Sequence, residues 1–165
     1  MSSTPALLPP DLLAMMARGV SVNVASRDRA LRPSVMRAVG SSVAAGGRSI
    51  TVYVSRRQSG QLVQDVSATG FIAVVFSEPA THRTVQVKAT RAKLRSADAS
   101  DQPVLAAYLA SMEHEIQLVG HPPALTRAML AHRLDDLVAI SFEPEHAFDQ
   151  TPGSKAGARL PGGPA

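Results

Sequence analysis

The sequence predicts a mainly β, α+β fold in which an antiparallel sheet or barrel carries peripheral helices. Five or six segments have the alternating apolar pattern of strands, and the two longest helical patterns stand late in the chain, one after the other. A parallel fold would instead alternate strands with helices. With 165 residues the chain suits one domain, which we expect over residues 1–150, followed by a Pro/Gly-rich tail over residues 151–165.

The first elements predicted are a short helix and a β-hairpin. The helix covers Pro9–Gly19, where Asp11 stands in position to cap the start and leucines and methionines gather on one side. Apolar residues alternate over Val20–Ala25, a polar turn follows at Ser26–Leu31, and Pro33–Val39 returns to extended structure. This order of strand, turn and strand is typical of a hairpin.

A strand, a basic corner and a helix come next. The glycine-containing turn Ala44–Arg48 precedes the strand Ile50–Val54, and Ser59–Thr69 has apolar residues at helical spacing before a stop at Gly70. The strand pattern divides its side chains between two faces. Ile50, Val52 and Val54 share one face, and Thr51, Tyr53 and Ser55 share the other.

The second half of the chain contains strands and the clearest helix. Phe71–Phe76 is apolar at every position and therefore on both faces, which predicts a central strand covered on each side. Asp101–Val119 has an apolar stripe at helical spacing, with Asp101 where a cap would stand. The other predicted elements are a strand over Thr84–Ala89 that continues to Leu94, a helix after Pro122-Pro123 reaching Arg133, and a last strand over Leu137–Phe142.

The corner Ser55–Arg57 is the main candidate for chemistry. N–H groups at a helix start point toward an anion, and the guanidinium of arginine offers two parallel donors to phosphate oxygens. The corner therefore predicts a phosphate site, although a solvated basic corner is the commoner setting for paired surface arginines. Thr51, Thr84 and Gln86 add polar groups on the strand faces opposite the apolar ones. A ligand with a polyhydroxylated chain attached to its phosphate would use such groups. A sheet with one face in solvent has the same pattern.

Several classes of function lack their sequence motifs. The chain has no cysteine, and its five histidines do not have zinc-protease spacing, so we expect no metal site. The nucleophile elbow, the P-loop and the dinucleotide fingerprint are all missing. The net charge, 17 − 13 = +4, and the scarcity of aromatic residues near the arginines disfavour a nucleic-acid partner. No apolar run approaches the ~20 residues that span a bilayer, and we expect a cytoplasmic protein without a membrane partner.

Four segments follow one another in a distinctive order. The run TVYVSRR occupies Thr51–Arg57, the helix QLVQDV and the strand FIAVVF follow it, and the run RTVQVKATRAKL occupies Arg83–Leu94. Their order and spacing resemble those of a known family, the pyridoxamine 5'-phosphate oxidase-like flavin-binding split barrels. In that family the first run has the pattern Thr-x-x-x-Ser-Arg-Lys, and the last run is similar to a further family strand. The resemblance covers Pro10–Phe142 and implies a split antiparallel β-barrel.

The resemblance also implies a homodimer that binds FMN at the subunit interface. In this chain Arg57 replaces the family's usual lysine, and Thr84 stands at the position of a ribityl-binding glutamine, with Gln86 on the same face as a substitute. The implied cofactor contacts are Ser55, Arg56 and Arg57 for the phosphate, Thr51 for the flavin or ribityl chain, Val35, Met36, Arg37 and Ala38 along the ring, and Thr84 or Gln86.

These features lead to two hypotheses for function. The first is an FMN-dependent oxidoreductase that acts on an unidentified small substrate, with an electron donor such as NAD(P)H. Vitamin B6 oxidation is disfavoured because the chain has no tryptophan and lacks the Arg-x-His signature with which the authentic oxidase ends. No residue has the pattern of a catalytic acid or base. The second is a non-catalytic carrier of flavin, haem or deazaflavin. The tail is expected either to lack fixed structure or to fold over the cofactor.

Overall fold

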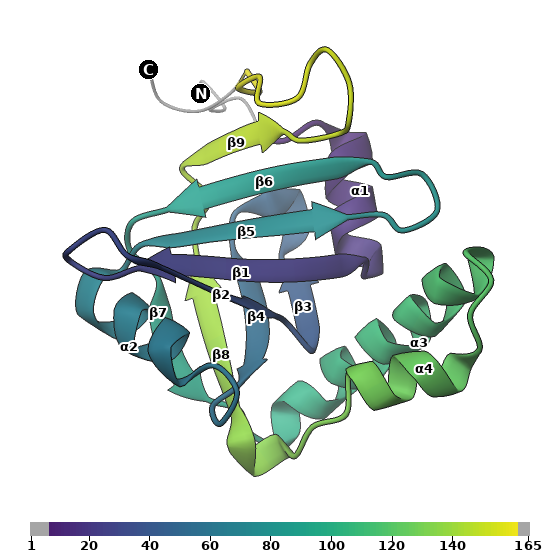
Figure 1. Ribbon diagram of the computed structural model, residues 1–165, viewed down its shortest axis with the longest axis horizontal. Coiled ribbons are helices and arrows are strands. Elements are labelled where there is room, and N and C mark those ends of the chain that lie inside the picture. Colours follow the sequence, from purple (N-terminus) through teal and green to yellow (C-terminus); the bar gives the residue numbers. More distant parts are fainter. Residues whose placement is uncertain (1–6, 162–165) are drawn as a thin grey trace.

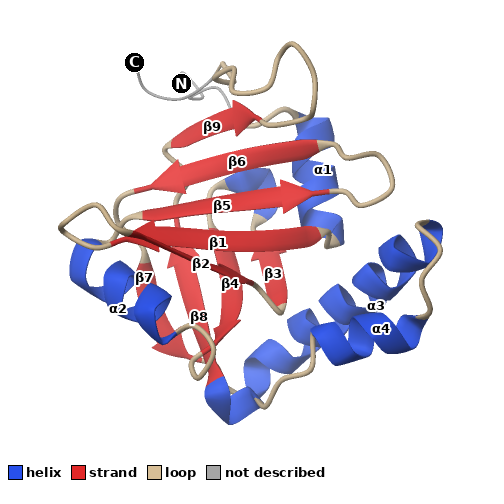
Figure 2. Cartoon of the chain, viewed as in Figure 1, coloured by secondary structure: helices blue, strands red, loops and turns tan. Residues whose placement is uncertain are grey.

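The computed structural model describes residues 7–161 and places their nine strands in two antiparallel sheets (Figures 1 and 2). Sequence neighbours pair as hairpins in both sheets, and each β1 residue from Asn23 to Ala25 has partners on both sides. The five-stranded sheet has the order β2 (Pro33–Arg37), β1 (Ser21–Arg27), β5 (Ile72–Ser77), β6 (Thr84–Ala89) and β9 (His146–Asp149). The four-stranded sheet has the order β3 (Gly40–Val43), β4 (Ile50–Ser55), β8 (Leu137–Phe142) and β7 (Lys93–Ser96).

The two sheets enclose a single aliphatic core. Val24 and Val74 from the five-stranded sheet and Val52 and Ile140 from the four-stranded sheet are fully buried in one cluster. Within the described residues the chain crosses from one sheet to the other four times, between β2 and β3, between β4 and β5, between β6 and β7, and between β8 and β9. The sheets are not joined into one closed ring, so the predicted split antiparallel barrel with peripheral helices is confirmed.

Within residues 7–161, four α-helices lie outside the sheets: α1 (Pro10–Arg18), α2 (Gly60–Thr69), α3 (Gln102–Leu118) and α4 (Pro123–Met129). Helix α2 packs against β1 and β2, and α3 packs against β3 and α4 (Figure 1). Under α3, Leu105 and Tyr53 form a second apolar cluster with Ala139. None of the helices in the described part has the length and apolar character that a membrane crossing requires.

Several predicted elements are confirmed, including the first helix, the β1–β2 hairpin and the strand β4. The predicted stop of α2 is confirmed as well. Gly70 adopts the left-handed conformation with a φ of 71° and donates its N–H to the Val66 carbonyl, a C-cap that glycine occupies without steric cost.

Other predictions of local structure are wrong. The strand expected to reach Leu94 ends at Ala89, because the chain leaves one sheet there and enters the other as β7. The strand expected to be last is followed by β9. Pro9, not Asp11, is the N-cap of α1, and α4 ends at Met129.

The strand β5 is central, as predicted, but only one of its faces is fully buried. Ile72, Val74 and Phe76 point into the core, whereas the intervening Ala73 and Val75 are half-buried on the outer face. After β9 the chain turns back along that strand, and Leu160 donates its N–H to the Ala147 carbonyl at 2.9 Å. The described part of the tail is therefore paired with the edge of the five-stranded sheet.

Candidate functional site

The predicted phosphate corner lies where β4 ends and the chain turns into α2. Ser55 is the last residue of β4 and is buried, whereas Arg56 and Arg57 are exposed in the turn before the helix. The side chain of Arg57 is 80% exposed, so its guanidinium stands in solvent at the surface. This geometry leaves both guanidiniums accessible to an anion from outside.

The donors of this corner converge on the carboxylate of Asp136. Ser55 Oγ donates to Asp136 Oδ2 at 2.5 Å, and the Arg57 N–H donates to Oδ1 at 3.2 Å. The Arg57 Nε atom lies 3.9 Å from the same oxygen, and the Arg56 N–H donates to the Asp136 carbonyl at 2.7 Å. An internal anion therefore occupies the position that the sequence predicts for a phosphate.

Asp136 is a site residue that the sequence reasoning missed. It lies in a 3₁₀ turn, Leu134–Asp136, immediately before β8. The register of the four-stranded sheet pairs Ser55 with Leu137, which brings the preceding aspartate beside the corner. The sequence feature that could have revealed Asp136 is the acidic pair Asp135-Asp136 just before the predicted strand Leu137–Phe142. This pair becomes informative only when the pairing partner of that strand is known.

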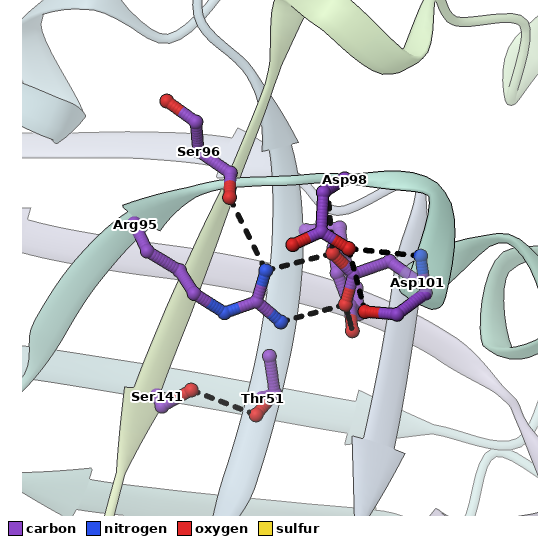
Figure 3. Close-up of polar contacts among 8 residues, drawn as sticks. Thr51, Arg95, Ser96, Asp98, Asp101 and Ser141 are labelled. Atoms are coloured by element: carbon purple, nitrogen blue, oxygen red, sulfur yellow. Dashed lines mark hydrogen bonds and ion pairs between the residues drawn. The ribbon is translucent and has the colours of Figure 1, made fainter.

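Thr51 lies on the same face of β4 as Ser55 but is not adjacent to it. Thr51 Oγ1 shares a hydrogen bond of 2.8 Å with Ser141 Oγ on β8 (Figure 3). Tyr53 stands between them along the strand and is buried beneath Leu105 of α3. The face that the alternating pattern presents as polar is therefore covered at its centre by a helix.

The hydroxyl of Tyr53 belongs to a polar network in which Tyr53 and Asp101 are buried and Arg95 is half-exposed. It donates to Asp101 Oδ1 at 2.8 Å, and Arg95 of β7 donates to both Asp101 oxygens at 2.7 and 2.6 Å (Figure 3). Arg95 holds the pKa of the Asp101 carboxyl well below its usual range, while burial, followed by the bond to Asp101, raises the pKa of Tyr53 to about 12. The network joins β4, β7 and the start of α3.

Replacing Asp101 with asparagine should lower the free energy of unfolding at neutral pH by about 1–3 kcal/mol, because the buried side chain at this position loses its charge-assisted bonds to the half-exposed Arg95. The carboxylate of Asp101 has a lower pKa in the folded chain than its ordinary 3.8. The contribution of the ionised carboxylate to the free energy of unfolding is therefore complete above pH 3.8 and is lost as the pH falls from there toward the pKa of the folded chain. Urea unfolding at neutral pH and near pH ~3 measures both effects. A deficit in the variant that is equally large at both pH values would contradict this assignment.

The other predicted cofactor residues lie on the five-stranded sheet. Val35 and Arg37 of β2 are on its outer face, where Val35 is 70% exposed and Arg37 donates to Ser21 Oγ at 2.8 Å. Met36 packs against the core, and Ala38 is fully buried just after β2. Of this segment, only the two outward side chains are positioned to contact a ligand on that face.

Thr84 and Gln86 lie on β6, also on the outer face of the five-stranded sheet. The Thr84 hydroxyl shares a hydrogen bond of 2.8 Å with Ser77 Oγ, and Gln86 is half-buried opposite Phe148. Within residues 7–161, no hydrogen bond or ion pair joins Thr84 or Gln86 to the corner Ser55–Arg57. One chain therefore presents two separate sets of predicted contacts, one on each sheet.

No group of histidine, aspartate and glutamate side chains within the described ranges is arranged to hold a metal ion.

One buried polar atom at the corner lacks a hydrogen-bond partner among the described residues. Ser59, the N-cap of α2, is buried, and its Oγ makes no hydrogen bond to any described residue. This hydroxyl lies at the helix start that follows the two arginines.

No protein-family model and no curated protein matches the chain. Solved structures do match it, among them an F420 reductase with a TM-score of 0.59, 12% identity and coverage of 85% of this chain and 98% of that one. A pyridoxamine 5'-phosphate oxidase-related, FMN-binding protein from Nostoc punctiforme has a TM-score of 0.50, 13% identity and coverage of 90% and 87%. HutZ, a heme storage protein from Vibrio cholerae, has a TM-score of 0.50, 13% identity and coverage of 86% and 94%.

These matches define the class of the protein by its fold. The chain has the split-barrel fold found in pyridoxamine 5'-phosphate oxidase-like proteins, and the resemblance predicted from its sequence is confirmed at that level. The matched structures are named for three different ligands, namely FMN, F420 and heme. At identities of 12–13% the likeness extends to the fold and not to the ligand.

Proposed function

We propose that the chain belongs to the pyridoxamine 5'-phosphate oxidase-like family and is a homodimeric FMN-binding oxidoreductase acting on a small substrate. The observation that carries this proposal is the convergence of the Ser55 hydroxyl and the Arg57 N–H on one carboxylate. A terminal phosphate likewise needs several hydrogen-bond donors that converge on one anionic group. The corner therefore fits the phosphate of FMN in the donors it supplies, provided that Asp136 yields its place.

Each side chain of the corner has a distinct part in this proposal. Ser55 and the backbone N–H of Arg57 donate to phosphate oxygens, and the two exposed guanidiniums neutralise the negative charge. FMN, when bound, supplies two-electron hydride chemistry. The protein positions the cofactor, and we assign no residue as a catalytic acid or base.

The predicted cofactor contacts lie in two separate places on one chain, and this separation supports a dimer. Thr84 and Gln86 lie on the five-stranded sheet, whereas Arg56 and Arg57 follow a strand of the four-stranded sheet. A second copy can bring one set to the other, and the exposed Val35 on β2 is an apolar contact available for it. The dimer completes a site that a single copy presents in halves.

Comparing FMN with riboflavin tests the phosphate corner. We expect FMN to bind at least about tenfold more tightly than riboflavin, because a charge-assisted hydrogen bond contributes about 1.5–3 kcal/mol. Quenching of flavin fluorescence on titration with the purified protein gives both dissociation constants. Equal affinity for the two flavins would refute the phosphate corner, and no binding of either would refute the proposed function.

A haem carrier is the second candidate, because HutZ, which has the same fold, is named as a heme storage protein. The absorption spectrum of the protein as isolated distinguishes the candidates. A flavin spectrum that is bleached by NAD(P)H and restored by oxygen or a quinone supports the oxidoreductase. A bound flavin that does not cycle supports a carrier, and a Soret band in place of flavin absorption supports haem.

A further inference from the structure

A hollow of about 360 Å³ lies on the outer face of the five-stranded sheet, remote in sequence from the corner. Its lining includes Ala25 at the end of β1, Ala73 at the start of β5, and the apolar side chains of Leu31 and Phe71. Small-molecule sites have volumes of about 300–1,000 Å³ and mostly apolar linings. The size and lining of the hollow match that description.

The strand register explains why the sheet is hollowed here. Ala25 pairs with Ala73, and Ala73 pairs with Lys88 on β6, so these side chains form one row across the outer face. Their neighbours Val24 and Val74 point into the core and are fully buried. Two adjacent methyl groups leave open a surface that larger β-strand side chains would fill.

The rim of the hollow carries two cations held beside aromatic rings. The Arg27 guanidinium lies 4.1 Å from the centroid of the Phe71 ring, and Lys88 Nζ lies 5.0 Å from the centroid of the Phe148 ring. Within residues 7–161, neither Arg27 nor Lys88 forms an ion pair with a carboxylate. Contact with a ring leaves the positive charge free to attract an anion.

One carboxylate also lines the hollow, and it is already engaged. Glu145 Oε1 accepts from the Thr90 N–H at 3.0 Å and from Thr90 Oγ1 at 2.8 Å. Nearby, Arg159 donates to His146 Nδ1 at 2.9 Å, so a further cation lies next to a lining residue. The lining therefore combines an apolar surface with an excess of positive charge.

We propose that this hollow binds a small planar aromatic carboxylate. The aromatic ring lies over the two alanines between Leu31 and Phe71, and the carboxylate faces Arg27 and Lys88. Apolar burial supplies the affinity, and the two cations select an anion over a neutral molecule of the same shape. None of these side chains takes part in the phosphate corner or is among the predicted cofactor contacts, although Val35 of that set pairs with Ala25 beside the hollow. The test below uses the protein without added FMN, so its outcome is separate from that of the proposed function.

A pair of nearly isosteric ligands tests the proposal. Isothermal titration calorimetry of the full chain with 2-naphthoate and with neutral 2-naphthamide should give a dissociation constant about tenfold lower for the carboxylate. Lys88→Gln and Arg27→Gln should each weaken 2-naphthoate binding about threefold to tenfold and leave 2-naphthamide binding unchanged. Lys93→Gln, an exposed lysine on β7 of the other sheet, is the matched control and should change neither.

A second variant tests the location of the site. Ala73→Leu places a larger side chain in the middle of the hollow and should abolish binding of both ligands, while circular dichroism and thermal unfolding verify that the variant is folded. Unchanged binding in folded Ala73→Leu would overturn the assigned position. Equal affinity for 2-naphthoate and 2-naphthamide, or binding of neither, would overturn the assigned ligand class.

Discussion

The double variant Arg56→Ala/Arg57→Ala should bind FMN about 100-fold more weakly than the natural chain. The two guanidiniums are the exposed cations of the corner, and the loss of one charge-assisted bond from each amounts to about 3 kcal/mol. The loss of the two side chains costs the fold little, because among the described residues the Arg56 guanidinium makes one long hydrogen bond, of 3.4 Å to Ser96 Oγ, and Arg57 Nε lies 3.9 Å from Asp136 Oδ1. Flavin fluorescence titration measures the change.

Two controls separate the phosphate contact from other effects of the double variant. Riboflavin lacks the phosphate, so its affinity should differ between the variant and the natural chain by less than about threefold. Arg127→Ala removes an exposed arginine of α4 that is paired with Glu113, and it should leave FMN binding unchanged. A double variant that retains full FMN affinity would show that the phosphate lies elsewhere.

Asp136→Asn should have the opposite effect and raise the affinity for FMN about tenfold. The carboxylate of Asp136 uses the Ser55 hydroxyl and the Arg57 N–H that a phosphate would take, and its negative charge repels the phosphate. Asparagine has nearly the same shape and retains one oxygen that accepts from Ser55, but it removes the charge. The affinity for riboflavin should stay constant.

The neighbouring Asp135 supplies the matched control for this variant. Its side chain is 67% exposed and pairs with Arg133, and within residues 7–161 it makes no hydrogen bond to the donors of the corner. Asp135→Asn should therefore leave FMN affinity within about twofold of the natural value. If Asp136→Asn weakens FMN binding instead, the carboxylate organises the donors of the corner and does not compete with the phosphate.

The elements with strong local signals were predictable from the sequence. Helix α2 has helical apolar spacing and ends at Gly70, and β4 alternates throughout, so each was found close to its observed bounds. Strand β3 begins with Gly40, and glycine and serine have little preference for strands. The strand forms by pairing with β4, and its Gly40 lies against Leu105, where a Cβ atom would come within 2.6 Å of that side chain. Contacts between distant segments determine such elements.

The same limit applies to the candidate site. The strand-to-helix corner was correctly located, since Ser55 ends β4 just before α2. The position of Asp136 beside the corner was not predicted. This residue reaches the corner through the pairing of β4 with β8, which no local pattern encodes. Alternation likewise placed Tyr53 on a polar face, yet α3 covers this residue and converts its surroundings into a second core.

The return of the chain along β9 restricts how copies of the protein can associate. Asp149 donates its N–H to the Ala158 carbonyl and accepts from the Gly157 N–H, so backbone groups at this margin of the five-stranded sheet already have partners. A strand from another molecule cannot add there without first displacing the returning segment. Edge-to-edge growth of the sheet is blocked at β9, which directs self-association toward face-to-face packing or toward the margin at β2.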